Sequence, residues 1–253
     1  MGVLRRDFGP PELKKQFRPL GLDGCVAVQA RQTLDESRRL LALSGEYDFI
    51  RGVVGWAPLA GPGLNSALDE LGASPALKGL RHVVQDEPDP AFLDGAQFNT
   101  GLREVTRRGL TFDLLVFAEQ LPAVIRVVDR HPGQAFVLDH IAKPRLSRTG
   151  PDPVWAALIQ ELALRPHVSC KLSGLVTEVT EPAWDASLLT PYADLVLEAF
   201  SPRRLMFGSD WPVCLLRSSY QRWWSFVAAW AAQLSADEQA DLFGGAAVSF
   251  YHL

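Results

Sequence analysis

The sequence is poor in cysteine and has no long hydrophobic run. Its three cysteines, Cys25, Cys170 and Cys214, are odd in number and far apart, which is typical of reduced residues rather than of a disulfide framework or a metal motif. The longest uncharged stretches are too short or too interrupted for a membrane span, and residues 1–8 lack the apolar core of a signal peptide. We therefore expect a cytoplasmic protein with no membrane partner.

Several sequence motifs are also missing. Lysine and arginine total 25 against 29 acidic residues, and no basic block of five or more residues occurs, so a nucleic-acid partner is not indicated. There is no Gly-x-Ser-x-Gly motif, which argues against a serine hydrolase. Walker, dinucleotide-binding and zinc-finger motifs are absent as well.

What the sequence does contain is a regular alternation of short apolar runs and helical patterns. The predicted strands are residues 24–29, 50–56, 79–83, 110–114, 135–140, 168–173 and 204–210. The predicted helices are residues 34–44, 64–71, 97–108, 117–130, 154–164, 189–200, 220–233 and 236–243. Strands that alternate with helices predict parallel βαβ units in an α/β protein.

The strand count distinguishes two α/β architectures. An open doubly wound sheet would normally carry a glycine-rich turn after its first strand, but residues 29–32 contain no glycine. A (β/α)₈ TIM barrel takes about 250 residues but needs eight strands. A helix-like segment at 11–20 precedes the first of the seven predicted strands, and in a barrel this segment needs an earlier strand to connect from. We therefore predict a barrel whose first strand is absent or atypical within residues 1–8. We expect a single domain over residues 1–253.

Polar side chains stand at the ends of five predicted strands, where barrel enzymes carry their chemistry. They are Arg81 and His82 with Gln85 beyond, Asp113, the pair Asp139 and His140, Lys171, and Asp210. Each has a structural alternative: a buried histidine, an ion pair of Arg81 with Asp113, a lysine reaching to solvent, or an aspartate that caps a helix. Because neighbouring residues of a strand point to opposite faces, only one of Asp139 and His140, and one of Arg81 and His82, would face the barrel interior.

These residue types suit hydrolysis. A partly desolvated Asp210 is suited to act as general base toward water or general acid toward a leaving oxygen. His140 is suited to share a proton, ligate a metal or bind substrate. Lys171 and Arg81 are suited to stabilise an oxyanion or bind a carboxylate.

The same strand ends resemble the motifs of amidohydrolase-related proteins (amidohydrolase family 2) of the sugar-lactonase type, such as L-fuconolactonase-like and L-rhamnonolactonase-like enzymes. The last-strand motif is Phe-Gly-Ser-Asp-Trp-Pro at 207–212, and the sixth-strand motif is Phe-Val-Leu-Asp-His-Ile-Ala-Lys-Pro at 136–144. Further matches are Lys-Leu-Ser-Gly-Leu at 171–175, residues 79–88 and residues 112–116. The resemblance covers the chain from Leu4 onward.

The resemblance implies a barrel of the metal-dependent hydrolase type that hydrolyses a cyclic ester, usually a sugar-acid lactone, in carbohydrate metabolism. Asp210 would handle the proton of the attacking water, and His140 would be a catalytic residue, ligand or substrate contact. Arg81, His82, Lys171, Asp113 and Gln85 would be substrate-binding candidates.

The chain departs from the family at its metal ligands. Relatives begin with a strand ending in His-x-His, whereas this sequence has no histidine before His82 and none on its fifth strand. His140 and Asp210 remain as ligands, fewer than the three of a typical catalytic zinc site. A single divalent metal such as zinc therefore stays open, and no cofactor is assigned.

Two other interpretations remain. An incomplete barrel with unpaired sheet edges is suited to a catalytically impaired scaffold or binding protein, and the family also includes decarboxylases. Aromatic residues of segment 220–233 leave a homo-oligomer interface open, although packing against the barrel is the favoured alternative.

Overall fold

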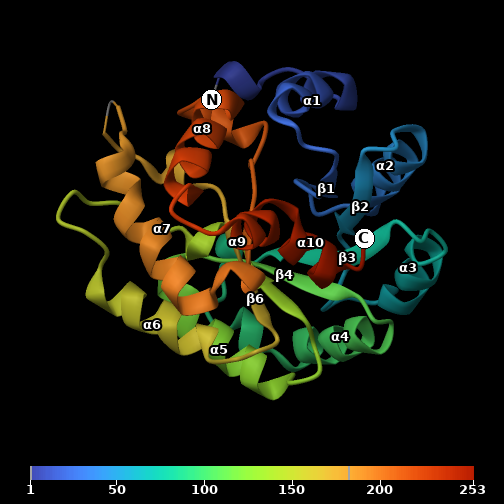
Figure 1. Ribbon diagram of the computed structural model, residues 1–253. Coiled ribbons are helices and arrows are strands. Elements are labelled where there is room, and N and C mark those ends of the chain that lie inside the picture. Colours follow the sequence, from blue (N-terminus) through green and yellow to red (C-terminus); the bar gives the residue numbers. More distant parts are fainter. Residues whose placement is uncertain (1, 182) are drawn as a thin grey trace. The chain divides into compact units, whose positions relative to one another are not determined.

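The computed structural model describes residues 2–181 and 183–253, and the strands and helices in this part of the chain alternate (Figure 1). The strands are β1 (Cys25–Val28), β2 (Ile50–Gly55), β3 (Leu77–Val83), β4 (Thr111–Leu115), β5 (Phe136–Leu138), β6 (Val168–Leu172) and β7 (Leu205–Phe207). The helices are α1 (Pro10–Phe17), α2 (Leu34–Glu46), α3 (Leu64–Leu71), α4 (Ala96–Arg107), α5 (Leu121–Arg130), α6 (Pro153–Ala163), α7 (Ala186–Phe200), α8 (Tyr220–Ala231), α9 (Ala236–Ala240) and α10 (Ala246–Tyr251).

All seven predicted strands are confirmed, but two of them end more than one residue earlier than predicted. The strand predicted over 135–140 ends at Leu138, and the one predicted over 204–210 ends at Phe207. The reason is backbone conformation, because His140 and Asp210 have positive φ values of 54° and 51° and so lie outside the extended region. The predicted functional residues thus lie in turns beyond the strands rather than on them.

The chain forms two compact units that interleave along the sequence. Unit 1 comprises residues 1–23, 139–164 and 169–247, and unit 2 comprises residues 24–138, 165–168 and 248–253. The expected single domain over residues 1–253 stays a prediction.

In unit 2, strands β1 to β5 pair in sequence order and all pairs are parallel. Helix α2 packs on β2, and α4 packs on β4. Val53, Leu80, Phe112 and Phe136, on four successive strands, are completely buried. Burial of side chains of this kind is worth about 1.5–3 kcal/mol each and is the main term that holds the sheet against its helices.

In unit 1, β6 pairs in parallel with β7, with Lys171 opposite Met206. Helices α6 and α7 pack against each other, and α7 also contacts β7 (Figure 1). Trp155 of α6 and Tyr192 of α7 meet ring to ring at 5.5 Å. Trp155 also donates to the Ile141 carbonyl and Tyr192 to the Arg145 carbonyl, so both helices contact the segment that follows β5.

The C-terminus belongs to unit 2 and reaches a buried acid there. The Tyr251 hydroxyl donates to the carboxylate of Asp113, at 3.1 and 2.9 Å from its two oxygens, and Asp113 is completely buried. The Lys78 ammonium donates to the carbonyl of His252 at 2.9 Å. In the described ranges 2–181 and 183–253, no helix is long and apolar enough to cross a membrane.

We expect Tyr251→Phe to lower the free energy of unfolding by about 1–3 kcal/mol, because a buried carboxylate loses a hydrogen-bond donor. Urea denaturation measures the change. Tyr47→Phe, which alters a half-exposed tyrosine of the same unit, is the matched control and should stay within about 0.5 kcal/mol of the parent. Equal stability of the two variants would contradict the role assigned to Tyr251.

Candidate functional site

His140 lies in an unusual left-handed turn directly after β5. Four successive residues from His140 to Lys143 have φ values between 48° and 60°. For residues with a Cβ this conformation costs roughly 1–2 kcal/mol each. The Lys143 amide donates to the His140 carbonyl at 2.8 Å, and the Trp155 indole donates to the Ile141 carbonyl at 3.0 Å. Strain of this kind persists only where surrounding contacts enforce it, and it is often found at functional sites.

The imidazole of His140 is held by the turn that follows β6. Its Nδ1 lies 2.7 Å from the Ser173 hydroxyl, and both side chains are buried. Gly174, at φ 71°, presses against the ring so closely that a Cβ there would be 2.6 Å from the His140 Cγ. The ring is therefore fixed by its hydrogen bond to Ser173 and by the close approach of Gly174, which leaves no room for a side chain at position 174.

Asp210 faces the Nε2 atom of this ring. The distance from His140 Nε2 to Asp210 Oδ1 is 3.7 Å, and the two side chains are 10% and 16% exposed. This distance is too long for a direct hydrogen bond but short enough for both groups to contact one bound water. The turn that carries Asp210 is fixed by the Trp223 indole, which donates to the Gly208 carbonyl at 2.8 Å.

Lys171 and Asp139 form a buried ion pair beside this pair. Lys171 Nζ lies 2.7 Å from Asp139 Oδ1, with the lysine side chain 12% exposed and the aspartate completely buried. Strand alternation, from which only one of Asp139 and His140 was expected to face the barrel interior, does not apply to them, because both residues lie in the turn beyond β5. Asp139 contacts Lys171, whereas His140 faces Asp210.

Glu178 is a further acid in this part of unit 1 that the sequence reasoning missed. It ends the short helix η7 (Leu175–Glu178), which begins directly after Gly174. Burial raises the pKa of the Glu178 carboxyl, Lys143 acts against this rise, and the charge of Asp210 adds to it. No motif marked Glu178, because its position depends on how the turn after β6 folds.

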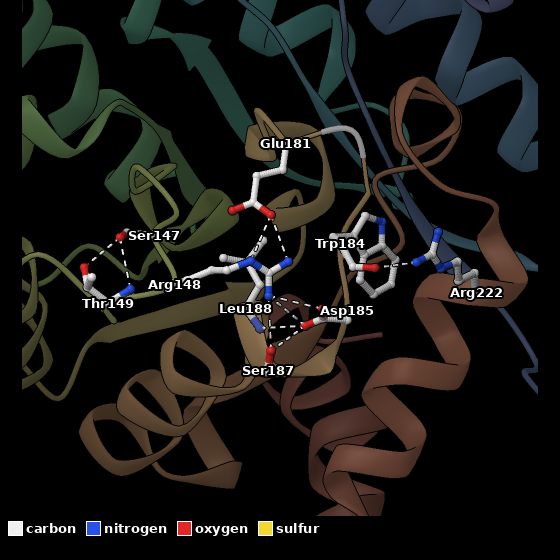
Figure 2. A network of polar contacts seen from close by, with 9 residues as sticks. All are labelled: Ser147, Arg148, Thr149, Glu181, Trp184, Asp185, Ser187, Leu188 and Arg222. Carbon is white, nitrogen blue, oxygen red and sulfur yellow. Dashed lines mark hydrogen bonds and ion pairs between the residues drawn. The ribbon is translucent and has the colours of Figure 1, made fainter.

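The loops after β5 and β6 are tied together by Arg148. Figure 2 shows its guanidinium between Glu181 on one side and Asp185 with Ser187 on the other. The Arg148 Nη2 lies 2.8 Å from Glu181, and its Nη1 lies 3.2 Å from Asp185. These charges are exposed, so solvent screens each pair and its contribution to stability is small. Their joint effect is to fix the end of the loop that begins at Ser173.

The remaining candidates belong to unit 2. The Arg81 guanidinium donates to the Gln29 carbonyl, and the Gln29 side-chain amide donates to the Arg81 carbonyl at 3.1 Å. His82 Nε2 lies 2.5 Å from Glu87, and its ring stacks on Phe92. Burial lowers the pKa of His82, with Glu87 acting in the opposite direction. The two side chains therefore have different partners.

Asp113 and Gln85 differ in accessibility. Asp113 is completely buried and accepts the Tyr251 hydroxyl, which gives it a structural role within unit 2. Gln85 is half-buried, and its side-chain amide donates to Asp86 at 3.3 Å. The structure therefore brings His140, Lys171 and Asp210 together in unit 1, while substrate binding by Arg81, His82, Gln85 and Asp113 stays a prediction.

Comparison with known proteins supports one family over the whole chain. The family model described as amidohydrolase matches residues 2–253. An L-fucono-1,5-lactonase from Burkholderia multivorans is 43% identical over 263 residues, covering 100% of this chain and 88% of the relative. A second L-fucono-1,5-lactonase, from Burkholderia ambifaria, is 33% identical and covers 100% of this chain and 88% of that relative.

A solved structure agrees with these relatives. The crystal structure of an amidohydrolase from Burkholderia multivorans with bound zinc superposes with a TM-score of 0.94 at 43% identity, covering 100% of this chain and 91% of that one. The predicted fold class, an α/β protein of the TIM-barrel type, is thus confirmed. So is the prediction of an enzyme, a hydrolase of the amidohydrolase superfamily similar to lactonases.

The zinc of that relative is not matched by a ligand set here. In residues 2–181 and 183–253, no group of three or more histidine, cysteine, aspartate or glutamate side chains could hold a metal ion. His140 and Asp210 supply two donors, whereas catalytic zinc sites use three protein ligands. The described residues do not fit a zinc site, and the chemistry below uses protein side chains and water alone.

The family model matches residues 2–253, and the alignment with a relative at 43% identity covers all of this chain. This chain belongs to the amidohydrolase family.

Proposed function

We propose that the protein hydrolyses a sugar-acid lactone. The observation that carries the proposal is the buried pair of His140 and Asp210, 3.7 Å apart, in a chain that is 43% identical to an L-fucono-1,5-lactonase over its whole length. That relative makes L-fucono-1,5-lactone the first substrate to test. Opening such a ring needs an activated water, a base for its proton and a donor for the developing oxyanion.

The pair supplies the first two requirements. A water that donates to His140 Nε2 and to Asp210 Oδ1 keeps a lone pair free to attack the lactone carbonyl carbon. Asp210 accepts a proton of this water as the carbon–oxygen bond forms. When the ring ester bond breaks, the ring oxygen takes up that proton and becomes a hydroxyl group. The other product is a carboxylic acid, which keeps the second proton of the water until it releases it to solvent and becomes a carboxylate.

Lys171 is proposed to meet the third requirement. Its ammonium is nearly buried, and the charge of Asp139 at 2.7 Å keeps it protonated in place. A fixed cation in surroundings with little water stabilises a developing oxyanion more strongly than a solvated one does. Arg81, His82, Gln85 and Asp113 remain candidates for substrate binding.

Asp210→Asn should lower kcat/KM for L-fucono-1,5-lactone by about 10²–10⁴-fold, because the amide cannot accept the water proton. Proton release in a weakly buffered indicator assay follows the reaction. Asp152→Asn is the matched control, since Asp152 caps α6 through its side chain and asparagine caps equally well. Full activity of Asp210→Asn would disprove the assigned role, and no turnover of any aldonolactone by the folded parent would disprove the proposed function.

Treatment with a chelator should leave kcat/KM unchanged, because the two donors of this site hold a divalent metal too weakly for a working enzyme. The same assay is run after dialysis against EDTA and again after addition of zinc. A loss of activity on dialysis that zinc restores would contradict a mechanism based on side chains and water alone.

A further inference from the structure

Phe8 of the N-terminal segment packs on Trp211, the residue that directly follows Asp210. The two ring centroids lie 5.3 Å apart and the ring planes are perpendicular, which is a favourable edge-to-face contact. Both side chains are half-buried, and both belong to unit 1. The proposed chemistry uses neither ring, although the contact reaches the residue next to the proposed base.

The N-terminal segment meets the loop after β7 at a second place. The short helix η1 (Gly2–Leu4) contacts η9 (Val213–Leu216), the short helix that follows the Asp210 turn. The Cys214 amide of η9 donates to the Asp210 carbonyl at 2.8 Å. Helix α1 in turn contacts α8, which follows this loop (Figure 1). The N-terminal segment therefore contacts the loop both at Trp211 and at η9.

Phe8 is itself held by Arg6. The Arg6 guanidinium lies over the Phe8 ring, 3.8 Å from its centroid, in a cation–π contact. The same guanidinium binds both carboxylate oxygens of Glu12, with Nη1 at 2.7 Å from Oε2 and Nη2 at 2.5 Å from Oε1. Glu12 lies in the first turn of α1. The ring that packs on Trp211 is thus attached to a helix.

We infer that Phe8 is a positioning residue, which fixes through Trp211 the turn that carries Asp210. The inference rests on the proposed function, because it concerns where the proposed base lies. Asp210 has a φ of 51°, a conformation that is unfavourable for a residue with a Cβ and that persists only where surrounding contacts enforce it. The Trp223 hydrogen bond to the Gly208 carbonyl fixes the turn before Asp210. The Phe8 contact fixes it after Asp210.

Phe8→Ala should lower kcat for L-fucono-1,5-lactone about tenfold, with KM little changed. The variant removes the ring on which Trp211 packs, so the turn relaxes and Asp210 shifts relative to the attacking water, while the groups that bind the substrate are kept. A displacement of about 1 Å at a reacting group can cost about 10²-fold in rate. Phe8→Tyr keeps the aromatic ring and should retain a kcat within about twofold of the parent.

Phe250→Ala is the matched control. Phe250 is a half-buried phenylalanine of unit 2, and its ring meets that of Tyr251 edge to face at 4.8 Å between centroids. Its replacement removes a comparable aromatic contact and should leave kcat within about twofold of the parent. An unchanged kcat in Phe8→Ala, or an equal loss in Phe8→Ala and Phe250→Ala, would overturn the inference.

A double-mutant cycle tests whether Phe8 acts through Asp210. Phe8→Ala should lower kcat/KM about tenfold in the parent but leave it nearly unchanged in Asp210→Asn, where the base that Phe8 positions is already gone. The same loss in both backgrounds would show that Phe8 acts independently of Asp210 and would overturn the inference.

Backbone amide NMR of the full-length protein tests the positioning role without turnover. We expect the Asp210 amide signal to shift in Phe8→Ala, to return to its parent position in Phe8→Tyr, and to stay in place in Phe250→Ala. A shifted signal without turnover of any lactone by the parent would disprove the proposed function alone. Turnover by the parent with an unshifted Asp210 signal in Phe8→Ala would disprove the role of Phe8 alone.

Discussion

The proposed site depends on one constraint, which is the fixed distance between the side chains of His140 and Asp210. A distance of 3.7 Å between two nearly buried side chains is kept only if the turns that carry His140 and Asp210 are each fixed by contacts with neighbouring elements. The turn after β5 is left-handed over four residues and is anchored by Trp155, while the turn before Asp210 is anchored by Trp223. Trp155 of α6 and Trp223 of α8, which pack in the core and also donate a hydrogen bond, thus fix the positions of the two polar groups. This is how a site of few residues can be held in a precise geometry.

The general arrangement of the site could be predicted from the sequence, because it depends on local patterns. Apolar runs that stop at Asp139 and Asp210 mark strand ends, and parallel strands bring their carboxyl ends to one edge. All seven strands and the family followed from these patterns. The helix predicted over 64–71 agrees with α3 at both ends, since the helical period and the flanking glycines delimit it.

The finer geometry could not be predicted, because it depends on contacts between distant residues. The left-handed turn at His140 breaks strand alternation, so Asp139 and His140 both find partners where one was expected to point away. Ser173 and Gly174 lie within the Lys-Leu-Ser-Gly-Leu motif at 171–175, but the motif does not predict their contact with His140, and Glu178 lies in no motif. The proximity of these residues to His140 or Asp210 arises only when the turns after β5, β6 and β7 fold. The hydrogen bond from Tyr251 to the buried Asp113 could not be predicted either, because it requires the C-terminus to return to β4.

The central claim is that His140 and Asp210 act on one water, and a double-mutant cycle with His140→Gln and Asp210→Asn tests it most directly. Residues that serve one function as a unit show strongly non-additive losses. With a shared water, kcat/KM of the double variant should fall no further than that of the more impaired single variant. If the two losses instead multiply, the residues act independently and the shared water is contradicted.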